Sequence, residues 1–513
     1  MKRNILILMA LFVCAGLFAQ GEMDAIRLSS SDLQGTARGQ AMGGAFGALG
    51  GDITGILINP AGLGLYRSSE VNMTVALNSF NLQTDWQGTI NREGTVKFNC
   101  DNISYIGYYP TGNINFPVLN FAFSYNRLKN FNRRYSASGR GMNTSLTDYI
   151  AAITHGIYYD DMNVGSQYSR YDPYSNGKIP WLSTLGWLGY FINDDTDYSY
   201  SGLFPDETVA PRLRMSERGS IESYDFSLGG NIGNTIYLGL TVSFTDLFYH
   251  LDSSYEEEFN ARENIGLDNY LETTGAGCQL KLGAIWRPVD FLRLGVAYHS
   301  PTVYALTDYY QGNTTADYGG IHEWAKTPDD ALTHYCFDTP PSWIFSVAGI
   351  FGTKAILSLD YDFKDYKRMT LMDHQRILKD DSNEFINDDF KAASTFRAGL
   401  EYRFTSQFSG RLGYSFVQNP YEKTFKDGGR EAMIIGTIPH YTIDGDVNYF
   451  TAGIGYRFTP RFYMDAAFVY RTQNDDLYYY PSILSDGKFQ VKSTPACLTN
   501  RAYKGLVTMG YKF

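Results

Sequence analysis

The chain has 513 residues, a net charge of -11 and a pI of about 5.2, so its overall charge disfavours nucleic-acid partners. It contains 41 Tyr, 33 Phe and 51 Gly at a mean hydropathy of -0.27. Beyond residue 20 we find no apolar run of the roughly 18 residues that a membrane-spanning helix needs. These properties exclude a helical membrane protein and are typical of a β-barrel, in which lipid-facing and lumen-facing residues alternate.

Residues 1–20 predict a secretory signal peptide. Lys2 and Arg3 precede an apolar run from Ile5 to Phe18, and polar sequence follows Gln20. The run is shorter than a spanning helix, which is typical of a signal that is removed. We therefore expect an exported protein whose mature chain begins near Gly21.

Residues 21–68 precede the first predicted strand and are rich in small residues. Eleven of the seventeen positions from Gly35 to Gly51 are Gly or Ala. The run Asn59-Pro60-Ala61-Gly62 is a turn signal that ends any helix. No Gly-Lys-Ser/Thr follows the glycines, which argues against a phosphate-binding loop. Because small residues let backbone pack tightly, this segment predicts a hatch that plugs the lumen of a barrel.

Residues 69–513 predict the barrel itself. In one segment Ile236, Leu238 and Leu240 share a face, while Tyr237 and Thr241 lie on the other, as expected for a strand between lipid and lumen. On this pattern we place about fourteen strands at 69–80, 96–109, 117–127, 221–231, 234–250, 272–286, 290–301, 341–351, 354–364, 393–404, 407–418, 446–458, 461–472 and 500–513. The fold class is therefore all-β, a transmembrane antiparallel β-barrel of about 14 strands with both ends on the periplasmic side.

The links between these strands alternate between short and long, which is the pattern of short periplasmic turns and long external loops. The long links are expected near 81–95, 128–220, 251–271, 302–340, 365–392, 419–445 and 473–500. A barrel of about fourteen strands leaves a lumen wide enough for a small solute, so the hatch is needed to close it.

The largest external loop, 128–220, contains two apolar stripes at helical spacing. The candidate substrate-binding residues in these stripes are Leu146, Ile150, Ile153, Trp181, Leu182, Leu185, Leu188 and Phe191. Two interpretations stay open: the stripes pack against each other as a local core, or they form a hydrophobic groove at the cell surface.

The hatch residues resemble those of the FadL/TodX-type outer-membrane transporters, and the match looks like a Bacteroidetes-like member of that family. The matching positions are Gly35, Arg38, Gly39, Met42, Gly43, Ala45 and the run Asn59 to Leu63. Arg293 to Pro301 and Thr339 to Ser342 are similar to two further places in the family. The resemblance implies hatch or gate roles for Arg38, Gly39, Met42, Gly43, Asn59, Pro60, Ala61 and Gly62.

The resemblance also implies a function. An apolar molecule, such as a long-chain fatty acid or an aromatic hydrocarbon, would pass without energy coupling from the loop groove to a lumen pocket lined by aromatics. It would then leave sideways toward outer-membrane lipid when the hatch or a strand kink opens. The family further implies a monomer in the outer membrane that uses no cofactor. The terminal Phe513 resembles the signal read by the barrel-assembly machinery.

Arg38, Arg293 and Arg411 are candidates to bind a fatty-acid carboxylate, judged by orientation alone. The favoured alternative is that they pair with luminal Asp360, Asp362 or Asp465, because charges in a confined lumen tend to be paired. Two other functions stay open, namely a barrel subunit of a type IX-like secretion system and a surface adhesin. A haem-like ligand also stays open.

Enzymatic chemistry has little support in the sequence. His299-Ser300 lies at the end of a predicted strand, but no G-x-S-x-G motif is present, and the seven His residues lack metal-ligand spacing such as H-E-x-x-H. We therefore expect no catalytic and no metal site. Cys100, Cys278, Cys336 and Cys497 allow three disulfide pairings, and the sequence does not select among them.

Overall fold

The computed structural model describes residues 20–513 apart from 166–170, 197, 206, 261–262, 330, 429, 435 and 486–487. The predicted signal peptide lies outside the described residues except for Gln20.

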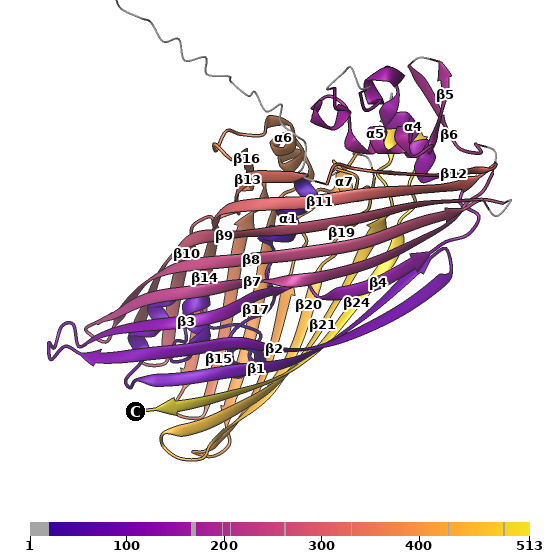
Figure 1. Cartoon of the computed structure of the whole chain (residues 1–513). Coiled ribbons are helices and arrows are strands. Elements are labelled where there is room, and N and C mark those ends of the chain that lie inside the picture. The colour runs from indigo at the N-terminus through magenta and orange to yellow at the C-terminus, as the bar shows by residue number, and fades with distance from the viewer. Residues whose placement is uncertain are drawn as a thin grey trace, which may run out of the picture.

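Fourteen long strands form one closed antiparallel barrel, drawn in Figure 1. In chain order they are β1 (Glu70–Trp86), β2 (Thr89–Pro110), β3 (Val118–Asn130), β7 (Ala210–Ile232), β8 (Ile236–Glu258), β9 (Asn264–Val289), β10 (Leu292–His299), β14 (Ser342–Phe351), β15 (Ala355–Asp365), β17 (Ala392–Arg403), β18 (Phe408–Val417), β20 (Val447–Arg457), β21 (Phe462–Tyr478) and β24 (Ala496–Lys512). The last strand pairs with the first from Glu70↔Lys512 to Asp85↔Cys497, which closes the sheet. The predicted fold class is confirmed.

The two faces of the wall are those that the alternation predicts. On β8, Leu238 and Phe244 face the lipid and are 47% and 49% exposed. Tyr237 and Thr241, which lie on the opposite face of the strand, are buried toward the lumen. The predicted inward carboxylates Asp360 and Asp465 are buried as well. Apolar side chains therefore meet lipid while charged groups are held inside.

The prediction of long loops at 81–95 and 251–271 is wrong, because strands occupy most of these residues, and the loop predicted at 473–500 is shorter, covering 479–495. β1 and β2 continue to a two-residue turn at Gln87-Gly88, where both residues have positive φ. β8 and β9 remain paired out to Glu258↔Asn264, and β21 and β24 out to Leu477↔Ala496. Backbone hydrogen bonds continue the sheet beyond the apolar band, where the polar side chains carry no lipid-facing signal.

The remaining strands belong to the external connections: β4 (Arg133–Ser138), β5 (Ile192–Thr196), β6 (Ser199–Gly202), β11 (Val303–Tyr318), β12 (Ile321–Lys326), β13 (Leu332–Asp338), β16 (Thr370–Asp373), β19 (Tyr441–Ile443), β22 (Ile483–Ser485) and β23 (Lys488–Val491). The α-helices are α1 (Glu22–Ser29), α2 (Ala37–Ala41), α3 (Thr54–Ile58), α4 (Leu146–Thr154), α5 (Trp181–Leu188), α6 (Asp380–Asp389) and α7 (Lys423–Lys426). The 3-10 helices are η1 (Pro60–Leu65), η2 (Tyr159–Met162), η3 (Pro173–Ser175) and η4 (Tyr366–Arg368). Among the described residues, no helix combines the length and apolarity needed to cross a membrane.

The external connections gather at one end of the barrel. In Figure 1, α4, α5, β5 and β6 lie beyond the same end as α6, and the C-terminus lies at the opposite end. A single buried apolar cluster joins these connections to α1, and it includes Leu146, Leu182, Met23 and Ile26. We call this assembly of external loops the cap. All four cysteines beyond the signal peptide are free thiols.

Candidate functional site: the hatch, the cap and the luminal cavity

The segment Glu22–Leu65 runs through the barrel interior, and we call it the hatch. The hatch passes so close to the wall that several positions on the inner face of the wall strands hold glycine. A Cβ on Gly239 would overlap the carbonyl carbon of Pro60, and one on Gly413 would overlap the backbone nitrogen of Gly43. Further wall glycines that approach the hatch in the same way are Gly283, Gly295, Gly399 and Gly453. The absence of side chains at these positions lets the hatch backbone lie directly against the strands.

The Asn59-Pro60-Ala61-Gly62 turn is bonded to the wall by its first side chain. The Asn59 amide nitrogen Nδ2 lies 3.1 Å from the Ala284 carbonyl oxygen on β9 and 3.3 Å from the Val296 carbonyl oxygen on β10. The Asn59 Oδ1 accepts a 3.1 Å hydrogen bond from the backbone nitrogen of Ala61 and so caps η1. One side chain therefore orders the turn and bonds it to two neighbouring strands.

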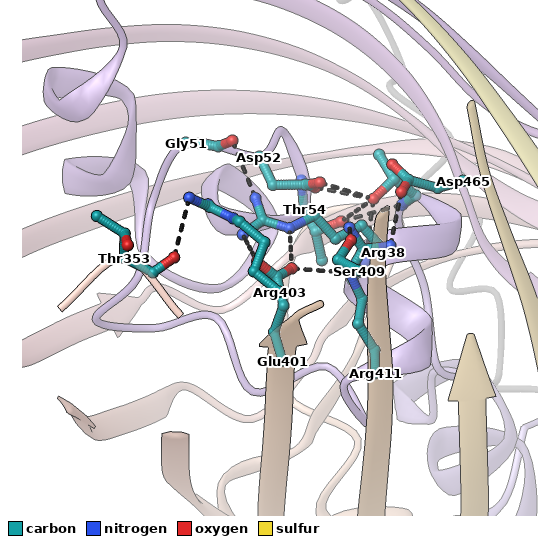
Figure 2. Close-up of polar contacts among 12 residues, drawn as sticks. Arg38, Gly51, Asp52, Thr54, Thr353, Glu401, Arg403, Ser409, Arg411 and Asp465 are labelled. Carbon is teal, nitrogen blue, oxygen red and sulfur yellow. Dashed lines mark hydrogen bonds and ion pairs between the residues drawn. The ribbon is translucent and has the colours of Figure 1, made fainter. Parts of the chain in front are cut away.

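An ion-pair network holds the other half of the hatch, as Figure 2 shows. Arg38 Nε lies 2.8 Å from Glu401 Oε2 on β17, and Arg411 Nε on β18 lies 2.7 Å from the same oxygen. Arg411 Nη1 also lies 2.6 Å from Asp465 Oδ1 on β21. Burial alone would lower the pKa of Arg38, but Glu401 and Asp52 raise the pKa above its ordinary value, so Arg38 stays charged. The hatch is thus bonded directly to β17 by a charge-assisted hydrogen bond, and Glu401 and Arg411 extend the network to β18 and β21.

The backbone of the hatch is also bonded to inward side chains of the wall. The Ala37 nitrogen donates to Thr508 Oγ1 at 2.7 Å, and the Gly47 nitrogen donates to Asp360 Oδ2 at 2.9 Å. Arg38 and Gly39 lie in α2, Met42 ends that helix, and Gly43 contacts β18. The predicted hatch residues therefore lie together inside the barrel, while their role as a gate stays a prediction.

The three arginines considered for a carboxylate ligand are all bonded to the protein itself. Arg38 and Arg411 share Glu401, and Arg411 pairs with Asp465 as the alternative interpretation predicted. Arg293 Nη1 donates to the carbonyl oxygen of Leu49 in the hatch. These contacts indicate a structural part for all three arginines.

The structure places the eight candidate substrate-binding residues on or beside α4 and α5 in the cap. Five of them are fully buried, namely Leu146, Ile150, Leu182, Leu185 and Phe191. Ile153, Trp181 and Leu188 are partly buried and pack against the same cluster. The helices cross closely at Gly186, where a Cβ would lie 2.6 Å from the Ile150 side chain. The two stripes therefore pack together, and their role in binding a substrate stays a prediction.

Trp181 has aromatic neighbours on both sides. Its ring centroid lies 4.8 Å from that of Tyr174 in the same loop and 4.8 Å from that of Tyr310 on β11. Trp181 thus connects the helical part of the cap to β11, a strand of another external connection.

A cavity of about 390 Å³ lies in the lumen between the hatch, the wall and the base of the cap. Six aromatic side chains line it, namely Phe80, Phe131, Tyr304, Tyr366, Tyr421 and Tyr449. Charged and amide side chains line it as well and are more numerous, so the lining of the expected lumen pocket is mixed and not aromatic alone. The physical reason is that the inward face of a barrel wall is polar, and the hatch covers only part of it.

A second cavity, of about 20 Å³, lies higher in the cap beside α1. Its lining is mostly apolar and includes Met23, Leu251, Leu271 and Ile438, together with Arg27. Burial lowers the pKa of His440 in the same lining to about 4, so this imidazole is neutral at pH 7.

Two wall residues that hold the hatch, Glu401 and Thr508, were not among the predicted site residues. Glu401 lies between the exposed residues Leu400 and Tyr402, so the strand alternation places it on the lumen face. That alternation was a signal that could have identified it. Nothing in the sequence showed that Arg38 would be its partner, because the two residues are 363 positions apart.

A closed barrel of fourteen antiparallel strands with an N-terminal hatch in its lumen defines a class of outer-membrane transport protein. This chain belongs to the family described as outer membrane protein transport protein (OMPP1/FadL/TodX), whose model matches residues 234–499. The predicted family and the predicted localisation in the Gram-negative outer membrane are confirmed. The matched family is one of transport proteins, not of enzymes.

Two crystal structures have a similar fold. A FadL homologue from Pseudomonas aeruginosa is 13% identical, with 94% of this chain and 99% of that chain covered at a TM-score of 0.53. The toluene transporter TodX from Pseudomonas putida is 12% identical, with 94% and 99% covered at a TM-score of 0.51. No curated protein sequence matches this chain.

Proposed function

We propose that this protein carries apolar small molecules passively across the outer membrane, with long-chain fatty acids and aromatic hydrocarbons as the substrate classes. The observation that carries the proposal is the apolar cluster that runs from α4 and α5 in the cap to α1 in the hatch. Met23, Ile26 and Leu28 of α1 belong to that cluster and also line the luminal cavity. An apolar molecule that enters the cap thus has apolar contacts down to the lumen.

Entry takes place between α4 and α5. Ile153, Trp181 and Leu188 are the partly exposed members of the two stripes and are the first to contact a ligand. The buried members, Leu146, Ile150, Leu182, Leu185 and Phe191, line the groove once the helices separate. Burial of an alkyl chain contributes about 0.8 kcal/mol per methylene, which is enough for affinity without placed polar contacts.

The hatch acts as the gate of the lumen. In this proposal Arg38, Gly39, Met42, Gly43, Asn59, Pro60, Ala61 and Gly62 hold it against the wall, and a shift of the hatch or a kink in a strand opens a lateral exit to outer-membrane lipid. The bulge in β3 at Leu128 supports this, because the Leu128 carbonyl accepts a 3.0 Å hydrogen bond from the Asp32 nitrogen of the hatch. The wall and the hatch are therefore coupled where the sheet is irregular.

We further propose the division of the chain into a removed signal peptide at 1–20, a hatch at 21–68 and a barrel at 69–513. Phe513 is half-exposed at the end of β24 and is available to the barrel-assembly machinery. The barrel works as a monomer.

Uptake in proteoliposomes tests the proposal. We expect labelled oleate or toluene to enter vesicles that carry the folded protein, and uptake to fall severalfold when Trp181→Gln and Leu188→Gln are combined. Val164→Gln is the matched control, because Val164 is 57% exposed in the same loop and lies outside the stripes. If the folded wild type takes up neither compound, the transport proposal fails, and a role in protein secretion or adhesion becomes the better interpretation.

A further inference from the structure

The luminal cavity has a basic lining inside an acidic protein. Nine Lys and Arg side chains line it against five Asp and Glu, although the whole chain carries a net charge of -11. Low-dielectric walls strengthen such a local excess of charge. A neutral hydrocarbon makes no use of this lining, whereas an anion does, and this includes the carboxylate of a fatty acid.

Three of the lining cations have no carboxylate partner among the described residues. Within the described part of the chain, Lys129 on β3, Lys364 on β15 and Arg471 on β21 form no ion pair within 4 Å, whereas Arg397 pairs with Asp362 at 3.1 Å. Lys129 Nζ donates to the Arg27 carbonyl oxygen at 3.0 Å and to Ser30 Oγ, so it is partly engaged by the hatch. Arg471 Nη2 donates to Gln473 Oε1, so it is partly engaged by a neighbouring amide. The three strands are not neighbours in the sheet, so the three cations lie on different sides of an anion in the cavity.

Amide side chains form the other large group in the lining. Eleven Asn and Gln residues contribute to it. Gln40 is fully buried and Asn500 is only 7% exposed, and their Oε1 and Oδ1 atoms have no hydrogen-bond partner among the described residues. Asn130 Nδ2 and Asn419 Oδ1 are likewise buried without a partner. An amide offers both a donor and an acceptor, which matches the hydroxyl groups of a sugar.

We propose that the luminal cavity is a binding site for a polyhydroxylated anion, namely a sugar acid or sugar phosphate, either free or as the head group of a glycolipid. The cations neutralise the acidic group, and the amides bond the hydroxyls. Met23, Ile26 and Leu28 of the apolar cluster also line this cavity, but the cations and amides that bind the anion lie outside that cluster, so failure of oleate and toluene uptake leaves this binding proposal standing.

Calorimetric titration of the full-length protein in lipid nanodiscs tests the proposal, with empty nanodiscs as the blank. The probes are dodecyl β-glucuronide, the neutral dodecyl β-glucoside and free glucuronic acid. We expect the glucuronide to bind at least about tenfold more tightly than the glucoside, the scale of one charge-assisted hydrogen bond. Saturable binding of free glucuronic acid identifies a soluble sugar acid as a ligand, and binding of the glucuronide alone identifies a glycolipid head group.

Variants link this binding to the cavity. Lys364→Gln combined with Arg471→Gln should reduce glucuronide affinity to that of the glucoside, while Lys326→Gln leaves it unchanged because Lys326 pairs with exposed Asp329 on the outside. Asn500→Asp keeps the side-chain shape and adds a carboxylate, so it should lower the affinity for the glucuronide and leave the affinity for the glucoside unchanged. Equal affinities for the two glycosides, or a double variant that binds like the wild type while migrating as a folded barrel, would overturn the proposal.

Discussion

Arg38 Nε in the hatch lies 2.8 Å from Glu401 Oε2 in the wall, and both side chains are mostly buried. Glu401 also accepts from Arg411, so a single carboxylate neutralises one cation of the hatch and one of the barrel. This pairing connects a segment that precedes every strand to the tenth strand of the barrel.

Glu401→Gln should loosen the hatch. Removal of one partner from a buried ion pair leaves two arginines without their shared carboxylate and typically costs about 3–5 kcal/mol. We expect faster protease cleavage within Glu22–Leu65 and leakage of small hydrophilic solutes, measured by liposome swelling. Arg403→Gln is the control, because Arg403 lies two residues away and its contact in Figure 2 is a 3.4 Å bond to the exposed Thr353 carbonyl. Wild-type swelling rates in folded Glu401→Gln would contradict a role for this carboxylate in keeping the hatch closed.

Gly413→Val should displace the hatch from the wall. Its first side-chain carbon would overlap the Gly43 backbone nitrogen, and backbone cannot move aside as a flexible side chain does. Overpacking of this kind typically costs about 1–3 kcal/mol. Gly505→Val is the matched control in another strand, since a Cβ there meets nothing within 4 Å. Heat-modified electrophoretic mobility and hatch proteolysis should separate the two variants, and equal behaviour would mean that the close approach at Gly413 is dispensable.

Asn59→Ala should destabilise the turn that begins η1. It leaves the Ala61 nitrogen without its acceptor and removes the side-chain donor from the Ala284 and Val296 carbonyls, at about 1–3 kcal/mol for a buried group left unpaired. The measurement is hydrogen exchange of the backbone amides of residues 61–65, which should speed up in the variant. Asn113→Ala, in an exposed periplasmic turn, supplies the comparison. Unchanged exchange at residues 61–65 would show that the turn is held by other contacts.

Glu22 should make the folded protein less stable as the pH rises. Burial, with Asp389 and Asp24 nearby, raises the pKa of Glu22 from 4.5 to about 8. A carboxyl whose pKa is raised on folding contributes stability that is fully present below pH 4.5 and is lost as the pH rises toward 8. Glu22→Gln should therefore reduce the drop in thermal midpoint between pH 5 and pH 8, while Glu384→Gln on the exposed side of α6 should not. A drop as large in Glu22→Gln as in the wild type would exclude Glu22 as its source.

The sequence by itself determined the barrel, the order of its strands and the face that each residue occupies. Ile236, Leu238 and Leu240 alternate with Tyr237 and Thr241. Because one face of such a strand lies in lipid, the apolar residues can occupy only that face. The helices α4 and α5 were predictable for the same kind of reason, because an apolar stripe of period 3.6 appears in the local sequence. The ends of β1, β8 and β21 were not predictable from the sequence. Beyond the membrane both faces of these strands carry polar residues, so no apolar–polar alternation indicates a strand.

Only the tertiary structure decided what the inward residues do. The apolar stripe of α4 has the same sequence pattern whether Ile150 packs against Gly186 or faces an open groove. Amphipathicity predicts that one face of a helix is buried, but it does not predict what that face contacts. Likewise the pairing of Arg38 with Glu401 and the basic lining around Lys364 depend on the stagger of the closed barrel and on the path of the hatch through it. The stagger of the strands and the path of the hatch are set by contacts between residues hundreds of positions apart, so a local sequence pattern cannot predict them.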